Sequence, residues 1–201
     1  MSKAEKTRQY IIEQVSPLFN KHGYSGTSIS QIIKTIGLTK GAVYGNFDSK
    51  EAIALHALRY NYEQISEKIN TAAMAYENSC DRLAVSAAFF EQNYDYIDST
   101  GGCPLFNAAS ENDDGNPSLK ELVHELILDW EATIVHSIKR GIRRKEIKKN
   151  TNIKQFVTLF ISLIEGGIML TKTTGDKTYL SAAVRQVIEA VNTKLRISCP
   201  R

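Results

Sequence analysis

The chain has 201 residues, of which 42% are hydrophobic and 23% are charged, the composition of an ordinary globular protein. A chain of this length can bury a sizeable core without the help of disulfides or structural metal ions. No charge-free apolar run approaches the roughly 18 residues that a membrane span needs. The charged, amphipathic first residues lack the apolar centre and cleavage site of a signal peptide. We therefore expect a cytoplasmic protein without a membrane partner.

The net charge of +3 is unevenly distributed along the chain. Residues 1–50 hold seven basic and three acidic side chains, a net +4, which leaves −1 for the remainder. A basic amino-terminal end favours a polyanionic partner. The spacing of cysteines and histidines predicts no structural disulfide, metal site or cofactor, and no nucleophile elbow or phosphate-binding loop predicts an enzyme. The residues concerned are Cys80, Cys103, Cys199, His22, His56, His124 and His136.

The first predicted helix covers residues 4–22. Its apolar positions recur with helical period. They are Ile11, Ile12, Val15, Leu18 and Phe19. Gly23 offers the left-handed turn that ends a helix. Pro17 lies inside the pattern, where it either kinks the helix or begins its last turn.

Two short helices and a long one are predicted next. Ser28 and Gln31 fit a capping box that opens the second helix, and Gly37 closes it. Thr39 caps a third, very short helix. Asp48 with Glu51, three residues later, predicts a capping box for the long fourth helix. The second and third predicted helices form a helix-turn-helix that is held against the first helix.

The remaining chain also follows helical periodicity, and no strand-like alternation appears. Apolar stripes predict helices around residues 83–97, 104–112, 119–142, 156–170 and 180–195. The natural boundary falls near residue 50. We therefore predict an all-α protein with one domain over residues 1–50 and a second over residues 51–201.

The third helix lies in the stretch TKGAVYGNFDSK, residues 39–50, and is unusually slim. A helix enters the major groove of DNA only if its exposed face is not bulky, and Gly41, Ala42 and Gly45 keep this face thin. Each interior glycine costs about 1 kcal/mol of helix propensity against alanine. Because of this cost, close approach to a partner explains the glycines better than helix stability does. Val43 and Phe47, four residues apart, can share the inward face of the helix.

The outward side chains of this helix suit DNA. Lys40 can pair with phosphate or guanine, Asn46 can bond adenine, and the Tyr44 hydroxyl can reach a phosphate. Thr27 and Ser28, at the start of the preceding helix, can bind another phosphate with their hydroxyls and free backbone N–H groups. The full predicted DNA-binding set is Thr27, Ser28, Thr39, Lys40, Gly41, Ala42, Tyr44, Gly45, Asn46 and Lys50.

The segment GTSISQIIKTIGLTKGAVYGNFDSKEAI resembles the DNA-binding signature of TetR-type (TetR/AcrR) transcriptional regulators. The matching positions are Thr27, Gly37, Thr39, Lys40, Gly41, Tyr44, Phe47, Lys50 and Glu51. The sequence departs from the pattern at Gly45 and Asn46, where many relatives carry an aromatic residue or histidine, so its operator sequence cannot be copied from a relative.

The resemblance implies an N-terminal three-helix DNA-binding domain and a C-terminal helical domain for ligand binding and dimerisation. The implied function is a homodimeric, ligand-responsive repressor that a small-molecule inducer releases from operator DNA. The last two helices, with Gly166 and Gly167, suit a four-helix bundle across a two-fold axis; they also suit an intramolecular core. A helical protein-binding module that does not touch DNA is the competing interpretation.

Candidate inducer contacts are aromatic and polar residues on helices that would surround a cavity, although each suits an ordinary core equally. They are Tyr62, Phe90, Tyr94, Cys103, Phe106, Asn107, Trp130 and Phe160. Cys103 begins a helix, whose dipole would lower the thiol pKa, and Gly101 and Gly102 would leave it accessible. A redox- or electrophile-sensing repressor acting through Cys103 is therefore an alternative, as is a buried, inert cysteine.

The basic run KRGIRRKEIKK, residues 139–149, also permits two interpretations. It is either a second nucleic-acid patch or the solvated carboxyl end of a long helix, where cations offset the helix dipole.

Overall fold

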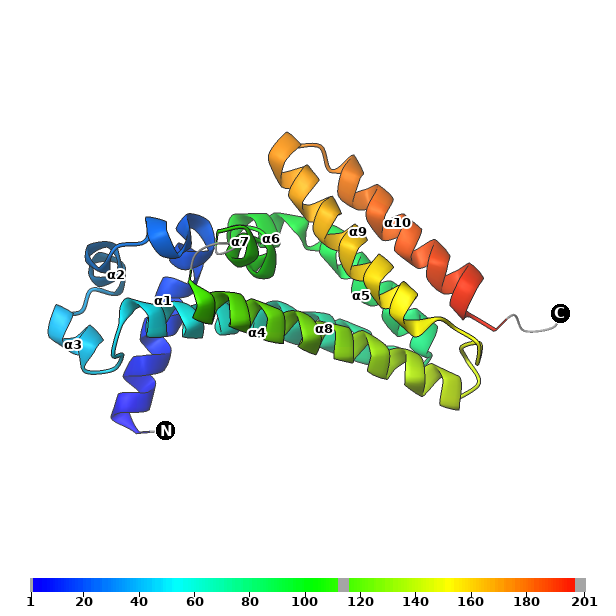
Figure 1. Cartoon of the computed structure of the whole chain (residues 1–201), viewed down its shortest axis with the longest axis horizontal. Coiled ribbons are helices and arrows are strands. Elements are labelled where there is room, and N and C mark those ends of the chain that lie inside the picture. The colour runs from blue at the N-terminus through cyan, green and yellow to red at the C-terminus, as the bar shows by residue number, and fades with distance from the viewer. Residues whose placement is uncertain (1, 112–115, 198–201) are drawn as a thin grey trace. The chain divides into compact units, whose positions relative to one another are not determined.

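The computed structural model describes residues 2–111 and 116–197, and these form helices joined by short connections (Figure 1). An isolated antiparallel bridge joins Ile147 to Arg196, and no strand occurs among the described residues. The all-α prediction is confirmed. The helices are α1 (Lys3–Gly26), α2 (Ile29–Ile36), α3 (Lys40–Tyr44), α4 (Lys50–Met74), α5 (Ser79–Gln92), α6 (Tyr94–Ser99), α7 (Pro104–Glu111), α8 (Pro117–Arg143), α9 (Ile153–Thr174), α10 (Thr178–Ala190) and a terminal π-helical turn, η1 (Val191–Leu195).

The chain forms two compact units. The first comprises Met1–Ile65 and Ser99–Leu126, and the second comprises Ser66–Asp98 and Ile127–Arg201. The helices α4 and α8 contribute residues to both units. These compact units do not coincide with the predicted functional domains, residues 1–50 and 51–201, and that functional division stays a prediction.

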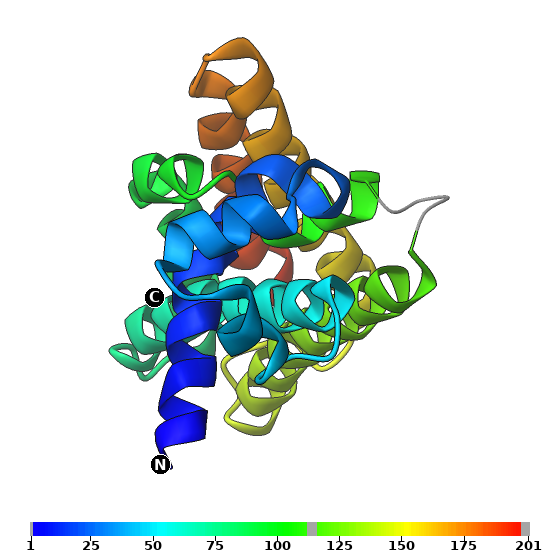
Figure 2. The ribbon, with the colours of Figure 1, turned by 90° about the vertical axis from the view of Figure 1, so that its left-hand side faces the viewer.

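The amino-terminal caps form as the sequence predicts. Ser28 and Gln31 make a reciprocal capping box at the start of α2. Gly37 closes α2 at φ 67°, and its N–H donates to the carbonyl of Ile33. Gly23, at φ 72°, breaks the helical geometry inside α1. Ser28 and Gly37 thus set the two ends of α2, which lies in the part of the chain that faces the viewer in Figure 2.

The start of α4 differs from the prediction. The cap is Ser49, whose hydroxyl accepts the N–H of Ala52, and whose carbonyl accepts the N–H of Ile53. Asp48 lies one residue too early for this role, so the predicted Asp48–Glu51 box is not the cap that forms. Serine competes equally well with aspartate for the N-cap position, which explains the shift by one residue.

The amino-terminal helices share one small core. Ile11 and Val15 of α1, Ile32 of α2, Val43 of α3 and Ile53 of α4 are all fully buried. Completely buried aliphatic side chains of this kind each contribute about 1.5–3 kcal/mol of transfer free energy. The five-residue α3 is far too short to be stable alone, so this core holds it in place.

In the second unit, α9 and α10 lie side by side and both pack on α5 (Figure 1). Gly167 faces α10 so closely that an added Cβ would meet the Cβ of Ala183 at 3.0 Å and the Cα of Leu180 at 3.1 Å. Gly166 is different, since a Cβ there would meet nothing within 4 Å. Gly167 therefore serves contact within the chain, whereas Gly166 faces open space.

The helix α9 is long and apolar enough, by length and composition, to cross a membrane. The search for a charge-free apolar run does not identify this helix, because Glu165 interrupts the apolar stretch. Only 33% of its most apolar window is buried in the described protein. One such helix is weak evidence for a membrane span, because a core helix of a soluble protein passes the same test.

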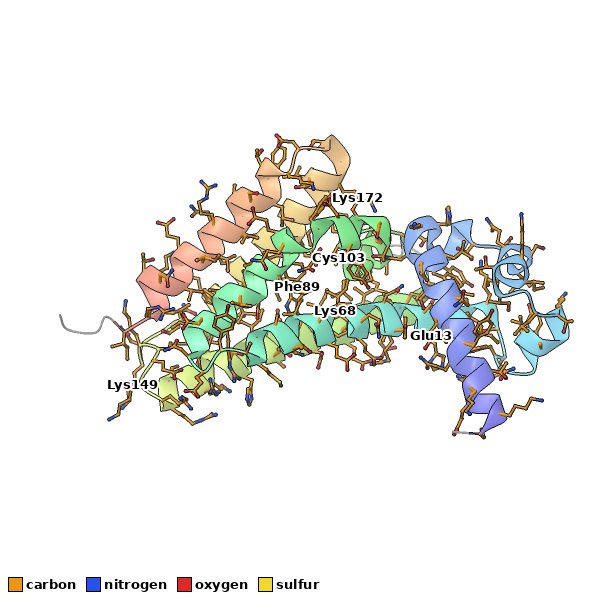
Figure 3. The ribbon with its side chains drawn as sticks, turned by 180° about the vertical axis from the view of Figure 1, so that it is seen from behind. Glu13, Lys68, Phe89, Cys103, Lys149 and Lys172 are labelled. Atoms are coloured by element: carbon orange, nitrogen blue, oxygen red, sulfur yellow. The ribbon has the colours of Figure 1, made fainter. Side chains whose placement is uncertain are left out.

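The carboxyl end of α8 uses part of its basic run to hold the fold. Arg140 donates to the carbonyl of Glu77 and to the Ser79 hydroxyl, and Lys148 Nζ donates to the carbonyl of Thr193. Arg144 pairs with Glu146. Lys149 is exposed (Figure 3). Internal contacts and a solvated helix end therefore account for this run. Cys199 lies outside the described residues.

Candidate DNA-binding interface

The short helix α3, which carries most of the predicted DNA contacts, is anchored by its inward side chains. Val43 is fully buried and Phe47 is 2% exposed, as the four-residue spacing predicts. Thr39 caps the helix, its hydroxyl accepting the N–H of Ala42. The remaining positions of the helix are thereby turned toward solvent.

The outward face of α3 is slim and carries a cation next to an aromatic ring. Lys40 and Tyr44 are exposed, and the Lys40 Nζ lies 5.8 Å from the centre of the Tyr44 ring. A Cβ at Gly41 would meet only the Thr39 hydroxyl, at 3.9 Å. Since the fold itself leaves room for a side chain at Gly41, internal packing does not require glycine there. Gly45 is more constrained, because a Cβ there would lie 3.1 Å from the Gly41 carbonyl oxygen.

Asn46 is placed differently from its predicted role. Its side-chain Nδ2 donates to the carbonyl of Ala42 at 2.8 Å, and it is only partly exposed. The amide therefore closes the carboxyl end of α3. The second N–H and the oxygen of the side-chain amide can still form hydrogen bonds. If Asn46 contacts a base, it therefore does so with an amide whose orientation is already fixed.

Thr27 and Lys50 also serve the fold. Thr27 is buried and its hydroxyl donates to the carbonyl of Gly23 at 2.7 Å, so the predicted phosphate contact through this hydroxyl is not available in this structure. Lys50 Nζ donates to the carbonyls of Tyr24 and Thr27 at 2.8 and 3.1 Å and lies 4.1 Å from the centre of the Tyr24 ring. Ser28 remains exposed at the start of α2.

Glu111 holds the same junction from the other side. Its carboxylate, at the end of α7, accepts the N–H groups of Tyr24 and Ser25 at 2.7 and 2.6 Å. Lys50 and Glu111 thus bind the carbonyls and the N–H groups, respectively, of residues 24–27, which follow the break at Gly23 and form the link between the main part of α1 and α2. Both are charge-assisted hydrogen bonds, which are stronger than neutral ones.

We expect Lys50→Ala to lower the free energy of unfolding by about 2 kcal/mol, because two carbonyls lose a charged donor. The measurement is urea denaturation followed by circular dichroism. Lys21→Ala, at an exposed position of α1, is the matched control and should change stability by less than about 0.5 kcal/mol. An unaltered urea midpoint in Lys50→Ala would show that the lysine is free to contact DNA instead.

Arg8 and His56 form a cluster with the end of α3 that sequence reasoning did not identify. Arg8 Nη1 donates to the carbonyl of Asn46 at 2.7 Å, and its Nη2 lies 2.6 Å from His56 Nε2. The guanidinium carbon of Arg8 lies 4.4 Å from the centre of the Phe47 ring, which meets the His56 ring edge-on at 5.8 Å. Thirty-eight residues separate Arg8 from Asn46, so no local sequence pattern announces the contact.

The predicted inducer contacts fall into both compact units. Tyr62, Cys103, Phe106 and Asn107 belong to the first unit, and Phe90, Tyr94, Trp130 and Phe160 to the second. Within the second unit, Trp130 contacts Phe90 and Phe160 at ring-centre distances of 5.8 and 6.3 Å. These three residues therefore form one aromatic cluster, as an apolar ligand wall or an ordinary core would. Tyr94 is buried, and burial raises the pKa of its phenol, with Asp98 and Asp95 adding to the effect.

Phe106 and Asn107 have other surroundings than the prediction assumed. Phe106 is exposed, because it lies on the outer side of α7. The Asn107 Nδ2 donates to the carbonyls of Asn20 and Gly101 and approaches the Asn20 side chain. Its amide thereby fixes the loop that precedes α7, which is a structural task.

The predicted accessibility of Cys103 is wrong. Residues 101–105 are all buried, and Cys103 is 8% exposed (Figure 3). The cause is Asn20, whose Nδ2 donates to the carbonyls of Thr100 and Gly102 and draws the loop against α1. The structure therefore favours the buried, inert cysteine. Cys80 is buried as well, and burial raises the pKa of its thiol.

Neither of two surface grooves formed by described residues is lined by a predicted inducer contact. One, of about 370 Å³, lies between α1 and α4 and includes Arg8 and His56. The other, of about 570 Å³, lies along the start of α9 and includes Gln155, Leu159 and Ser162. No group of three or more metal-binding side chains is found in the described part of the chain.

Comparisons with known families agree with this arrangement. The family described as "Bacterial regulatory proteins, tetR family" matches residues 11–57, and the one described as "Tetracyclin repressor-like, C-terminal domain" matches residues 79–187. The HTH-type transcriptional regulator YxaF of Bacillus subtilis (strain 168), itself described as uncharacterized, is 29% identical over 199 residues, covering 96% of this chain and 100% of YxaF.

Solved structures of similar chains have the same fold. A TetR family transcriptional regulator from Cytophaga hutchinsonii superposes with a TM-score of 0.93 at 31% identity, covering 99% of each chain. A TetR transcriptional regulator from Chloroflexus aurantiacus J-10-FL gives a TM-score of 0.91 at 33% identity, covering 98% of this chain and 100% of that one.

Proposed function

The chain belongs to the TetR family of transcriptional regulators, and from that membership we propose that it is a cytoplasmic, homodimeric repressor that a small molecule releases from operator DNA. Members of the family are DNA-binding transcription factors and not enzymes.

The observation that carries the DNA-binding proposal is the outward face of α3. Gly41 has room for a side chain in the free protein, yet carries none. A slim face matters only when a partner approaches closely, and the exposed Lys40 and Tyr44 on this helix suit phosphates and base edges. Lys40, Gly41, Ala42, Tyr44 and Gly45 therefore form the proposed groove-facing surface. Ser28 and Thr39 add backbone-positioning contacts at the two helix starts.

Three predicted DNA contacts take indirect roles in this proposal. Lys50 and Thr27 fix the link between α1 and α2, and Asn46 fixes the end of α3. These residues affect DNA affinity by fixing the position of the helices. The remaining hydrogen-bonding groups of Asn46 and Lys50 can in addition contact DNA directly.

Dimerisation is supported by the outer face of α9. Leu159, Leu163, Gly166 and Leu170 recur at intervals of three or four residues along α9 and are half-buried or exposed. Gly166, in open space, allows a second helix to approach. A two-fold pairing of this face would place the same residues opposite each other. Two DNA-binding heads in one dimer read a near-palindrome, with the second contact intramolecular.

A ligand would act by favouring a dimer whose recognition helices are wrongly spaced for DNA. The helix α4 runs on from the DNA-binding head into the second unit, and Glu111 joins α7 to the link between α1 and α2. These are the connections through which a change in the regulatory part can reach α2 and α3. The aromatic cluster of Phe90, Trp130 and Phe160 is the proposed apolar wall of the inducer site.

The test is a salt titration of the affinity for DNA. The probe is a fluorescent duplex selected by the protein from a random-sequence pool, and binding is followed by anisotropy. We expect a steep linear fall of log K with log salt, of slope about −0.9 for each phosphate contacted. A helical protein-binding module would select no sequence. A pool that remains unenriched, or binding independent of salt, would contradict the proposal.

A further inference from the structure

Arg8, on α1, links the carboxyl end of α3 to His56 of α4. It donates to the Asn46 carbonyl at 2.7 Å, stacks on Phe47 at 4.4 Å and reaches His56 Nε2 at 2.6 Å. Asn46 itself bonds back to Ala42. Through these contacts the position of α3 depends on whether Arg8 stays in place.

The contact between Arg8 and His56 is possible in only one protonation state of the imidazole. A guanidinium has donors and no acceptor, so His56 Nε2 must be the acceptor and the ring must carry its proton on Nδ1. A second proton, at Nε2, would bring two donors and two positive charges together at 2.6 Å. The hydrogen bond would then become a repulsion.

The surroundings of His56 oppose its positive charge. The groove around it contains Arg8 and Glu5 from α1 together with Arg59, Tyr60 and Glu63 from α4. The Glu5 carboxylate is already engaged at the Ser2 cap, and Arg59 pairs with Glu125 of α8. Arg8 and His56 are both exposed side chains. Partial desolvation of the ring, followed by the charges of Arg8 and Arg59, nevertheless lowers the pKa of His56 below its ordinary value of 6.5.

Because the pKa of His56 is lower in the folded than in the unfolded chain, the stability of the head depends on pH. Well above pH 6.5, His56 is neutral in both states and the contact contributes fully. As the pH falls below this value, the unfolded chain takes up a proton first, and stability is lost until His56 in the folded head is also protonated.

We infer that Arg8 and His56 form an acid-sensitive latch on the recognition helix, in which protonation of His56 frees Arg8 from the end of α3 and weakens DNA binding. This inference rests on the proposed function. Both are positioning residues, because they act on DNA through α3. Acidification of the cytoplasm would relieve repression without any small-molecule inducer.

The test compares wild type with His56→Gln, whose side-chain oxygen still accepts a hydrogen bond but does not titrate. Affinity for the selected duplex is measured at constant ionic strength at about pH 7.5 and about pH 5.5, on either side of the ordinary histidine pKa. We expect wild type to bind about tenfold more weakly at the lower pH, because both heads of the proposed dimer lose an exposed charge-assisted hydrogen bond. His56→Gln should keep wild-type affinity at the higher pH and change less than about twofold.

His124→Gln, at an exposed position of α8, is the matched control and should retain the full pH response. Equal pH responses in wild type and His56→Gln would overturn the latch, whereas failure to bind any duplex at the higher pH would contradict the proposed function itself. Nuclear magnetic resonance of wild type gives a second readout that does not depend on the variant folding. The His56 ring and the Asn46 amide should titrate with one midpoint, and separate midpoints would also overturn the latch.

Discussion

Gly166→Arg is expected to yield a folded monomer that has lost most of its affinity for operator DNA. A Cβ added at Gly166 would meet nothing within 4 Å, so an arginine fits the isolated subunit. Replacing glycine inside a helix also favours the helix by about 1 kcal/mol. In the proposed dimer the same position faces its copy across the two-fold axis, where two arginines would repel. Loss of the second, intramolecular contact should lower affinity by about a hundredfold or more.

The decisive measurements are the mass in solution by light scattering and the affinity for the selected duplex. The variant should run at the 22.5 kDa of a single chain, and wild type at twice that mass. Ala132→Arg, an exposed position on α8, adds the same charge and should leave both mass and affinity unchanged. If Gly166→Arg stays dimeric, the two copies pair through another surface, and the outer face of α9 needs a different explanation.

Local signals in the sequence predict local structure well here. The Ser28–Gln31 box and the Gly37 stop occur where predicted, because each involves groups within one turn of helix. The start of α4 is displaced to Ser49 because two good capping residues are adjacent. On α4, helical spacing runs through Leu55, Leu58, Tyr62 and Ile65, yet of these four only Leu58 is buried, whereas Ile53 and Ala57 are fully buried. Since α4 is flanked on more than one side, helical period alone does not decide which face is inward.

The candidate site is predicted less completely than the fold. Exposure of Lys40 and Tyr44 follows from the inward pair Val43 and Phe47, which a four-residue spacing defines. The structural tasks of Lys50 and Asn46 do not follow from spacing, because their partners are backbone carbonyls that any residue supplies. The burial of Cys103 depends on Asn20, more than eighty residues away in sequence. Long-range polar contacts of this kind have no sequence signature of their own.

The double variant Lys40→Ala, Tyr44→Ala is expected to bind the selected duplex about a hundredfold more weakly while folding normally. Both side chains are exposed, so their removal costs the fold little. Each dimer would lose two copies of a charged contact, and a charged hydrogen bond contributes about 1.5–3 kcal/mol, so the total exceeds about 3 kcal/mol. The slope of log K against log salt should become shallower by about two, one unit for each lysine that contacts a phosphate.

The comparison with Lys139→Ala, Tyr179→Ala separates contact from charge. This pair is also exposed and lies in the second unit, outside the proposed interface. It removes the same net charge and the same type of ring. We expect its affinity and salt slope to match wild type, because a phosphate is neutralised only by a cation placed against it. Equal losses in the two double variants would mean that overall charge drives binding and that α3 does not lie in the groove. A loss confined to the α3 variant, with unaltered melting temperature and dimer mass, requires the slim face of that helix to meet the DNA.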